Sequence, residues 1–501
     1  MRKVMKRVGA LMASVVIALS SSIVAAAEEG YTYNYDYWGD VQYGPDAYAV
    51  SGVYTSVELG LDKKLTLAES LYVHENMLYI CDTGNNRIIE MERTEIDKFE
   101  VRRYIDSFKG KAEVKTLSGP TDISISEDGN YMFICDKGNE RVLKLDKDLN
   151  YIMEFTKPTD ATFDQSLSFQ PHRLITDKAG RVYCIATNVN KGLIKFEPDG
   201  VFSGFVGATP VSYTMADYLR KKFATAAQRA QMEAFVPTEY SNIYVDDSGF
   251  IYATSFNISA ADIDTGKIAP IRRLNLLGND ILIRNGEWKV IGDLYFDKGG
   301  GADGPSRFTD VTTFDNDVYT CLDKTRGRLF TYDDQGRMLW AFGGTGGNTK
   351  GYFKIPVSIE HMGYDLIVLD QQEASITVFS PTEFGNMVFS ALDQFSAGEY
   401  EKSAESWQKV IDLNGNYDLA YIGIGRTLLR QERYKEAMEY FELKYDRDNY
   451  SRAFKHYRQE WIEDNIVMII VVVLLVLCVP LAIGRIKRIK WQIDTADIFR
   501  V

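Results

Sequence analysis

The strongest constraint on the fold of this chain is a repeated motif. CDTGNNR runs from Cys81 to Arg87, and CDKGNER runs from Cys135 to Arg141. Each copy lies between two short apolar runs. Such runs alternate apolar and polar residues and are separated by turns rich in Asp, Asn and Gly, which is typical of antiparallel hairpins. The motif therefore indicates a repeated structural unit.

The same rhythm returns along most of the chain. Six copies fit between about residues 50 and 380, and they begin near Leu67, Gly119, Gln170, Pro237, Ser306 and Lys354. A unit of roughly 40–55 residues with four short strands is the size of a propeller blade. The sequence therefore predicts a mainly β fold, a six-bladed β-propeller over residues 48–385. The run Tyr48–Leu59 is expected to supply the outer strand of the last blade.

The segments ICDTGNNRIIEME and ICDKGNERVLKLD resemble the NHL repeat. The region as a whole is similar to a six-bladed NHL-type propeller of the gluconolactonase-like and TolB-like superfamily. The third copy lacks the Asp, and the fourth departs most, with later strands expected in IRRLNLLG and DILIRNG. We expect the turns to need Gly84 or Gly138, and an Asn, for positive φ. The residues predicted to organise these turns are Asp82, Asn85, Arg87, Asp136, Asn139 and Arg141.

The resemblance also implies an alternative function, because gluconolactonase-like propellers include calcium-dependent lactonases. Their metal ligands lie where the innermost strands begin. The equivalent positions here are Glu69, Thr121, His172, Ser241, Thr309 and Ile355. Of these residues, only Glu69 matches a metal ligand of that group. Calcium binds six to eight oxygen atoms, so this set is a poor calcium site. An alignment slip of one residue would add two aspartates, Asp122 and Asp310.

We therefore expect no catalytic residue, no metal site and no cofactor, and an enzyme is the less favoured interpretation. Only under the lactonase alternative would Glu69 bind calcium. The motifs GxSxG and HExxH are absent, and the four histidines are isolated in the sequence. The residues predicted to make one mouth of the channel a polar binding surface are Glu69, Asp122, His172, Arg173 and Asp310.

Both ends of the sequence carry membrane signals. Residues 1–27 combine a basic start, an apolar core and the run Ala25–Ala27, which predicts a cleaved signal peptide; the alternative is an uncleaved anchor. Residues 466–483 are uncharged and long enough to span a bilayer as one helix. Acidic residues precede this run and basic residues follow it. The positive-inside rule therefore predicts a short cytoplasmic tail at 484–501 and an extracellular bulk.

Two segments have helical spacing. An Ala-rich stretch at about 211–236 predicts a helical insertion in the propeller, which would serve either binding or packing. Residues 386–460 form two copies of a pattern about 34 residues long, the length of a tetratricopeptide repeat. Tyr400 corresponds to Tyr434, and Trp407 to Phe441, so this segment resembles a small tetratricopeptide-like module. Fewer than three repeats seldom fold alone, so we expect the module to pack against a partner.

Composition narrows the function classes. The net charge of −13 makes nucleic acid an unlikely partner, because an acidic surface repels phosphates. Four cysteines end strand-like runs and are expected to be free thiols, with disulfides as the alternative. Together these features predict an exported, single-pass protein of the cell membrane. It would act as an interaction scaffold that binds a protein, a glycan or a small ligand beside a transporter or an envelope-assembly system.

Overall fold

The computed structural model describes residues 32–95, 98–160, 162–207, 240–255, 258–264, 269–295, 304–346 and 349–498. The chain divides into two compact units, Met1–Asn386 and Met387–Val501. The predicted signal peptide at 1–27 and the predicted helical insertion at about 211–236 lie outside the described residues.

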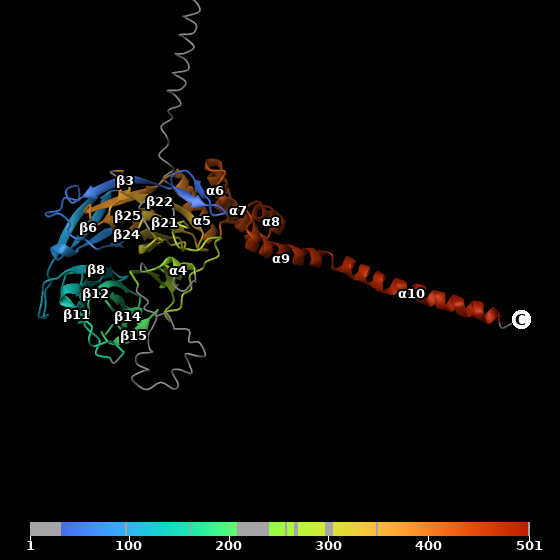
Figure 1. The fold of residues 1–501 in the computed structure, drawn as a ribbon, viewed down its shortest axis with the longest axis horizontal. Helices are drawn as coiled ribbons and strands as arrows, with labels where there is room; N and C mark the ends of the chain where they lie inside the picture. The colour runs from blue at the N-terminus through green and yellow to red at the C-terminus, as the bar shows by residue number, and fades with distance from the viewer. Residues whose placement is uncertain are drawn as a thin grey trace, which may run out of the picture. The chain divides into compact units, whose positions relative to one another are not determined.

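The first unit consists of antiparallel sheets whose strands follow one another along the chain (Figure 1). Each of the first three sheets has four strands. The first contains β4 (Ser70–His74), β5 (Met77–Asp82), β6 (Arg87–Glu95) and β7 (Lys98–Ile105). The second contains β8 (Pro120–Ile125), β9 (Tyr131–Asp136), β10 (Arg141–Asp146) and β11 (Tyr151–Phe155). The third contains β12 (Pro171–Thr176), β13 (Val182–Ala186), β14 (Leu193–Phe196) and β15 (Phe202–Val206).

The remaining three sheets differ from the first three in the number or the chain order of their strands. The fourth has three strands among the described residues, β16 (Asn242–Val245), β17 (Ile251–Thr254) and β18 (Ile271–Leu274), with the short helix α4 (Ala260–Asp264) before β18. The fifth is built on β19 (Phe308–Thr313), β20 (Tyr319–Asp323), β21 (Arg328–Tyr332) and β22 (Met338–Thr345). The sixth contains β24 (Pro356–Met362), β25 (Asp365–Asp370) and β26 (Ser375–Pro381), and its fourth strand is β3 (Tyr48–Thr55).

These sheets form a β-propeller. The six innermost strands contact one another in a closed ring, in the order β4, β8, β12, β16, β19, β24 and back to β4. The pairing of β3 with β26 confirms that the Tyr48–Leu59 run completes the last blade, so strands from the two ends of the unit close the ring. The sequence predicted six blades; the described residues form four four-stranded sheets, one sheet of four strands to which β1, β2 and β23 are added, and one three-stranded sheet.

The core lies between neighbouring sheets. One cluster, for example, joins Leu71, Leu78 and Ile89 of the first sheet to Ile367 and Val378 of the sixth. Burying the facing surfaces of two twisted sheets removes apolar area from water, which is the main stabilising contribution. The cysteines of the second strands belong to these layers, and all four are buried and free: Cys81, Cys135, Cys184 and Cys321.

Two local features differ from the sequence-based expectation. The N-terminal hairpin, β1 (Tyr33–Tyr35) and β2 (Val41–Tyr43), adds two strands to the outer edge of the fifth sheet, next to β22, where β23 (Tyr352–Phe353) also pairs. The prediction of a strand in residues 280–286 was wrong. A turn at residues 275–279 returns the chain to β18. The pairing there is limited to an isolated bridge between Leu274 and Asp280.

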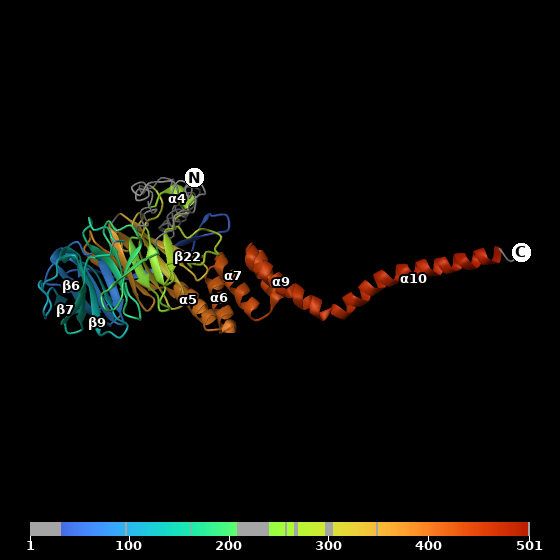
Figure 2. The same cartoon turned by 90° about the horizontal axis from the view of Figure 1, so that it is seen from below.

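Helices make up the rest of the chain. They are α5 (Glu383–Ser396), α6 (Tyr400–Leu413), α7 (Asp418–Arg430), α8 (Tyr434–Leu443), α9 (Arg447–Asp464) and α10 (Ile466–Ile498). Helix α10 is a single long helix with Pro480 inside it (Figure 2). Its segment Ile466–Ile493 is long and apolar enough to cross a membrane, and none of its most apolar window is buried.

Candidate functional site

The repeated Asp of the first motif joins three parts of its blade. Oδ2 of Asp82 accepts hydrogen bonds from Nε of Arg87 at 2.8 Å and from Nδ2 of Asn85 at 2.9 Å. Its Oδ1 accepts from the main-chain N–H of Thr66 at 2.8 Å, on the segment that leads into the innermost strand. A buried carboxylate with three donors is well satisfied, so its charge is compensated inside the blade.

The second copy repeats this geometry. Asp136 accepts from Nε of Arg141 at 2.9 Å, Nδ2 of Asn139 at 2.8 Å and the N–H of Ser118 at 2.8 Å. The same device, an Asp that ends the second strand, recurs without the rest of the motif. Asp323 accepts from the N–H of Arg307 at 2.8 Å.

The glycines of the motif have a different role from the one expected. Positive φ occurs at Asn86 (54°) and Glu140 (55°), not at Gly84 or Gly138. A Cβ atom on either glycine would lie 2.7 Å from a main-chain oxygen, that of Thr66 or Ser118. Glycine is needed because the backbone passes too close for a side chain, and its N–H donates to that same oxygen at 2.8 Å in both copies.

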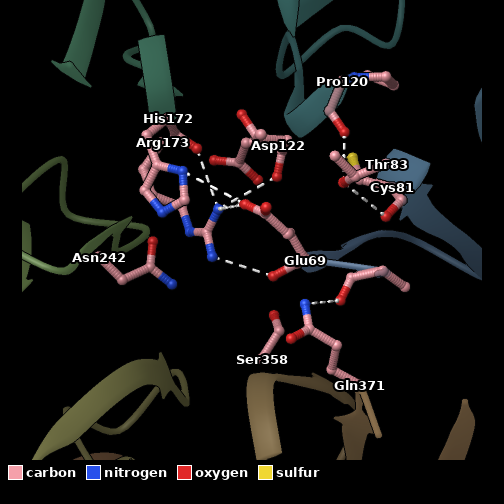
Figure 3. Close-up of polar contacts among 12 residues, drawn as sticks. Glu69, Cys81, Thr83, Pro120, Asp122, His172, Arg173, Asn242, Ser358 and Gln371 are labelled. Carbon is pink, nitrogen blue, oxygen red and sulfur yellow. Dashed lines mark hydrogen bonds and ion pairs between the residues drawn. The ribbon is translucent and has the colours of Figure 1, made fainter. Parts of the chain in front are cut away.

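Near the centre of the propeller, each innermost strand has a buried polar side chain at an equivalent position, and these side chains form a ring; Figure 3 shows Asp122, Arg173, Asn242 and Ser358 of this ring. The members are Ser70, Asp122, Arg173, Asn242, Asp310 and Ser358. A one-residue register shift precedes four of them, on β8, β12, β19 and β24, whereas β4 and β16 have none at this position. These shifts explain why an alignment by turns placed Thr121 and Thr309 where the structure places Asp122 and Asp310.

The two aspartates of the ring connect neighbouring sheets. Asp122 accepts from the N–H of Leu174 on the next innermost strand at 2.8 Å. Asp310 accepts from the N–H of Ile359 at 2.8 Å and from the Ser358 hydroxyl at 2.7 Å, and also from the Asn242 amide. Burial raises the pKa of each carboxyl to about 6, because removal from water disfavours the charged form more than these donors favour it.

Arg173 is the cation of the ring. Its guanidinium donates to three main-chain oxygens: that of Glu69 at 3.0 Å, that of Thr121 at 3.2 Å and that of His172 at 3.0 Å. The side chain therefore extends from the third sheet across the second to the first (Figure 3). Its Nε has no hydrogen-bond partner within the described structure.

Glu69 and His172 lie at this mouth of the channel. Oε2 of Glu69 is 3.4 Å from Nδ1 of His172 and 3.9 Å from a terminal nitrogen of Arg173. Burial, and then the charges of Arg173 and Lys137, lower the pKa of His172 well below its usual range. A neutral imidazole, a carboxylate and a guanidinium thus meet, and the structure brings four of the predicted binding residues together here: Glu69, Asp122, His172 and Arg173. Asp310 belongs to the same ring but contacts the fourth and sixth sheets.

These residues do not fit calcium. The Arg173 guanidinium lies 3.9 Å from the Glu69 carboxylate and would repel a divalent cation there. Asp122 and Asp310 already accept main-chain N–H groups. The hydroxyls of Thr121 and Ser241 donate to carbonyl oxygens, those of Pro171 at 3.3 Å and Phe308 at 3.0 Å. The donor set therefore lacks the convergent oxygens that calcium requires.

The opposite mouth holds a pocket that the sequence analysis missed. Its volume is about 220 Å³, and the carboxyl ends of β4, β16, β19 and β24 surround it. The polar residues of its lining are Glu75, Tyr244, Asp247, Thr313, Asp315, Glu360 and His361. The sequence does have a polar residue after several of the innermost strands. Because polar residues are common in all turns, this pattern could not have identified the pocket.

The pocket brings carboxyl groups close together. Burial raises the pKa of Asp247, and the neighbouring Asp315 raises it further. Burial, followed by the charges of Asp310 and Asp122, raises the pKa of Glu360 well above its usual range. His361 contacts the Thr312 hydroxyl through Nδ1 at 2.7 Å, and burial lowers its pKa to about 4. The imidazole is therefore neutral at pH 7, and the mouth is acidic.

Comparison with known proteins adds little. No protein-family model matches the sequence, and no curated protein matches it. Virginiamycin B lyase from Staphylococcus aureus is 12% identical, with a TM-score of 0.37 over 64% of this chain and 82% of that one. The β-propeller domain of Myceliophteria thermophila Cps50 (Swd1) is 10% identical, with a TM-score of 0.37 over 67% of this chain and 100% of that one. Likenesses at this level carry no information about function.

Proposed function

We propose that this protein is an exported, membrane-anchored interaction scaffold. The observation that carries the proposal is α10. Its segment Ile466–Ile493 has 28 residues, and the most apolar 18-residue window in it has a mean hydropathy of 3.5, with none of that window buried. Apolar side chains left in water along a whole helix are unfavourable, so a bilayer is the natural surrounding. At 1.5 Å per residue the uncharged part, residues 466–483, is about 27 Å long, which matches the hydrocarbon core.

The charges around α10 support one orientation. Glu460, Glu463 and Asp464 precede the apolar run, and Arg485 and Lys487 follow it. By the positive-inside rule the residues after Ile483 lie in the cytoplasm and the propeller outside. This orientation agrees with a signal peptide at residues 1–27.

We assign the first unit to the six-bladed NHL type, residues 48–385. Two observations support this assignment. The sheet β16–β18 occupies its own place in the closed ring of innermost strands, so it counts as the fourth blade. The turns of the first two blades each contain a carboxylate that joins an Arg, an Asn and a main-chain N–H, which supports a structural role for Asp82 and Asp136.

We assign residues 386–460 to a tetratricopeptide-like module. The equivalent residues Tyr400 and Tyr434 are the first residues of α6 and α8. Trp407 and Phe441 are buried, and each packs on a glycine of α7, Gly423 or Gly425. Large side chains from two helices that fill the space over small residues of a third are typical of such repeats.

Propellers and tetratricopeptide-like modules are interaction folds, and we assign a binding role to both units of this chain by analogy of fold. The acidic pocket is the concave surface we assign to recognition, because pockets at the mouth of a propeller channel present several strand ends to one ligand. The partner would be a protein or glycan of the envelope, beside a transporter or an assembly system.

Protease treatment of intact cells tests the proposal. In cells that make the full-length protein, external protease should digest the propeller and leave a fragment that begins near α10. A double variant, Val472→Arg and Leu475→Arg, should lose carbonate-resistant membrane association, because each Arg at the centre of a span costs about 3 kcal/mol. The conservative pair Val472→Leu and Leu475→Val is the control. A protected propeller would contradict the orientation.

A photo-crosslinker tests recognition at the pocket. Placed at Asp315 in intact cells, it should give a discrete adduct with a partner, whereas the same group at the exposed Asp148 on the second sheet should not. Equal labelling from both positions would contradict the assignment of the pocket.

A further inference from the structure

Helix α10 does not end where its apolar run ends. The uncharged residues stop at Gly484, yet the helix continues to Ile498. At 1.5 Å per residue, the next nine residues extend about 13 Å beyond the hydrocarbon core, which is the depth of one headgroup layer and the water next to it. The segment Arg485–Ile493 is therefore at headgroup level whenever residues 466–483 span the bilayer.

This segment has two kinds of exposed side chain. Ile486, Ile489 and Ile493 are 64%, 54% and 57% exposed. Their spacing of three and then four residues places them in one stripe along the helix. Four cations lie next to these isoleucines in the sequence: Arg485, Lys487, Arg488 and Lys490.

Helical geometry sorts these cations. Arg485 and Arg488, three residues apart, lie to one side of the isoleucine stripe, and Lys487 and Lys490 lie to the other. Positive charge on both sides of a helix just beyond its membrane span favours contact with anionic headgroups around it. No acidic residue lies between Gly484 and Ile493 to neutralise the four charges.

We propose that residues 485–493 bind anionic phospholipid headgroups of the bilayer that α10 crosses. The four cations contact headgroup phosphates on both sides of the helix at this level. Charge complementarity and continuity with the span select this occupant. The inference rests on the membrane anchoring proposed above, and it adds a lipid class to it.

Lipid retention in a reconstituted system is the test. The full-length protein is inserted into phosphatidylcholine vesicles that contain a minor share of phosphatidylglycerol, and is then extracted with mild detergent. The phospholipids that copurify should be enriched severalfold in phosphatidylglycerol over its share in the vesicles. Raising the salt concentration before extraction should reduce this enrichment, because contacts at the surface are screened.

Substitutions that remove or keep the positive charges test whether those charges cause the enrichment. Gln at positions 485, 487, 488 and 490 together (Arg485→Gln, Lys487→Gln, Arg488→Gln, Lys490→Gln) should remove the enrichment. The pair Arg485→Lys and Arg488→Lys should preserve it, since charge is kept. The matched control Lys455→Gln with Arg458→Gln changes exposed cations of α9 and should also preserve it.

The outcomes distinguish the two proposals. A wild-type protein that carbonate strips from the vesicles would overturn the membrane anchor itself. A protein that stays inserted but retains the two lipids in their vesicle ratio would overturn only the headgroup site. Enrichment that survives in the four-fold Gln variant would likewise overturn it.

Discussion

The guanidinium of Arg173 donates a hydrogen bond to the main-chain oxygen of Glu69 across 3.0 Å, although the two residues belong to the third and the first sheets. The same guanidinium is 3.9 Å from the Glu69 carboxylate. A positively charged side chain thus lies beside Glu69, the residue that would bind calcium if this propeller were a lactonase.

This contact predicts weak calcium binding at that mouth. Titration of the detergent-solubilised full-length protein with calcium, followed by calorimetry, should show no micromolar site that depends on Glu69. The reason is Coulomb repulsion by the buried Arg173 guanidinium, which lies 3.9 Å from the Glu69 carboxylate. Micromolar affinity that disappears in Glu69→Gln, but not in Glu75→Gln at the other mouth, would restore the lactonase alternative.

Removal of the repeated Asp should destabilise its blade. In Asp136→Ala, the buried guanidinium of Arg141 keeps Glu154 but loses its Nε acceptor, and the N–H of Ser118 is left without its carboxylate. We expect a loss of about 3 kcal/mol in the free energy of unfolding, measured by urea denaturation. The exposed Asp148→Ala is the control and should change it by less than about 0.5 kcal/mol. Unchanged stability together with lost partner binding would show that the motif is a site.

The ring aspartates make stability depend on pH. The pKa of Asp310 is about 6 in the folded protein and about 3.9 in an unfolded chain, so the folded state binds the proton more tightly. Acidification therefore favours folding: the gain begins as the pH falls through about 6 and is complete below about 3.9. Between pH 7 and pH 5 we expect about 1 kcal/mol from this carboxyl, and a similar amount from Asp122.

His361 acts in the opposite direction, since its pKa of about 4 in the folded protein lies below that of a free imidazole. The prediction therefore compares the pH dependence of a variant with that of the wild type, because His361 contributes equally to both. The change in unfolding free energy between pH 7 and pH 5 should be about 1 kcal/mol less favourable in Asp310→Asn than in the wild type. Asp148→Asn should behave as the wild type. Identical pH profiles for all three proteins would contradict a raised pKa at Asp310.

In the helical module, helix propensity and side-chain packing predict opposite effects on stability for one substitution, Gly423→Ala. Alanine favours a helix over glycine by about 1 kcal/mol, yet a Cβ at Gly423 would clash with the buried indole of Trp407. We therefore expect Gly423→Ala to lower the unfolding free energy of the module by about 1–2 kcal/mol. Gly415→Ala, where the added carbon meets no atom closer than 3.9 Å, should be nearly neutral.

A second substitution can relieve the clash. Trp407→Phe makes room for the new methyl group, so the double variant should be more stable than the sum of the two single changes predicts. Additive effects would mean that Trp407 and Gly423 are not in contact.

Local patterns in the sequence were sufficient for the propeller, the long apolar helix and the helical module. Period-two alternation, Asp- and Gly-rich turns and an uncharged run of 18 residues each reflect the chemistry of neighbouring residues, and these determine strands, turns and a long apolar helix. The turn residues Asp82 and Asp136 were also predictable, because their Arg and Asn partners lie within five positions of them along the chain.

The interior of the channel depended on the tertiary structure. Arg173 reaches Glu69, and Asp310 reaches Ile359, across strands that are far apart in sequence. A one-residue bulge before each decides which side chain enters the ring, and that bulge is set by hydrogen bonds to the adjacent strand. The acidic pocket is likewise assembled from four strand ends. Contacts of this kind exist only once the ring of sheets has closed, because no stretch of sequence contains both partners.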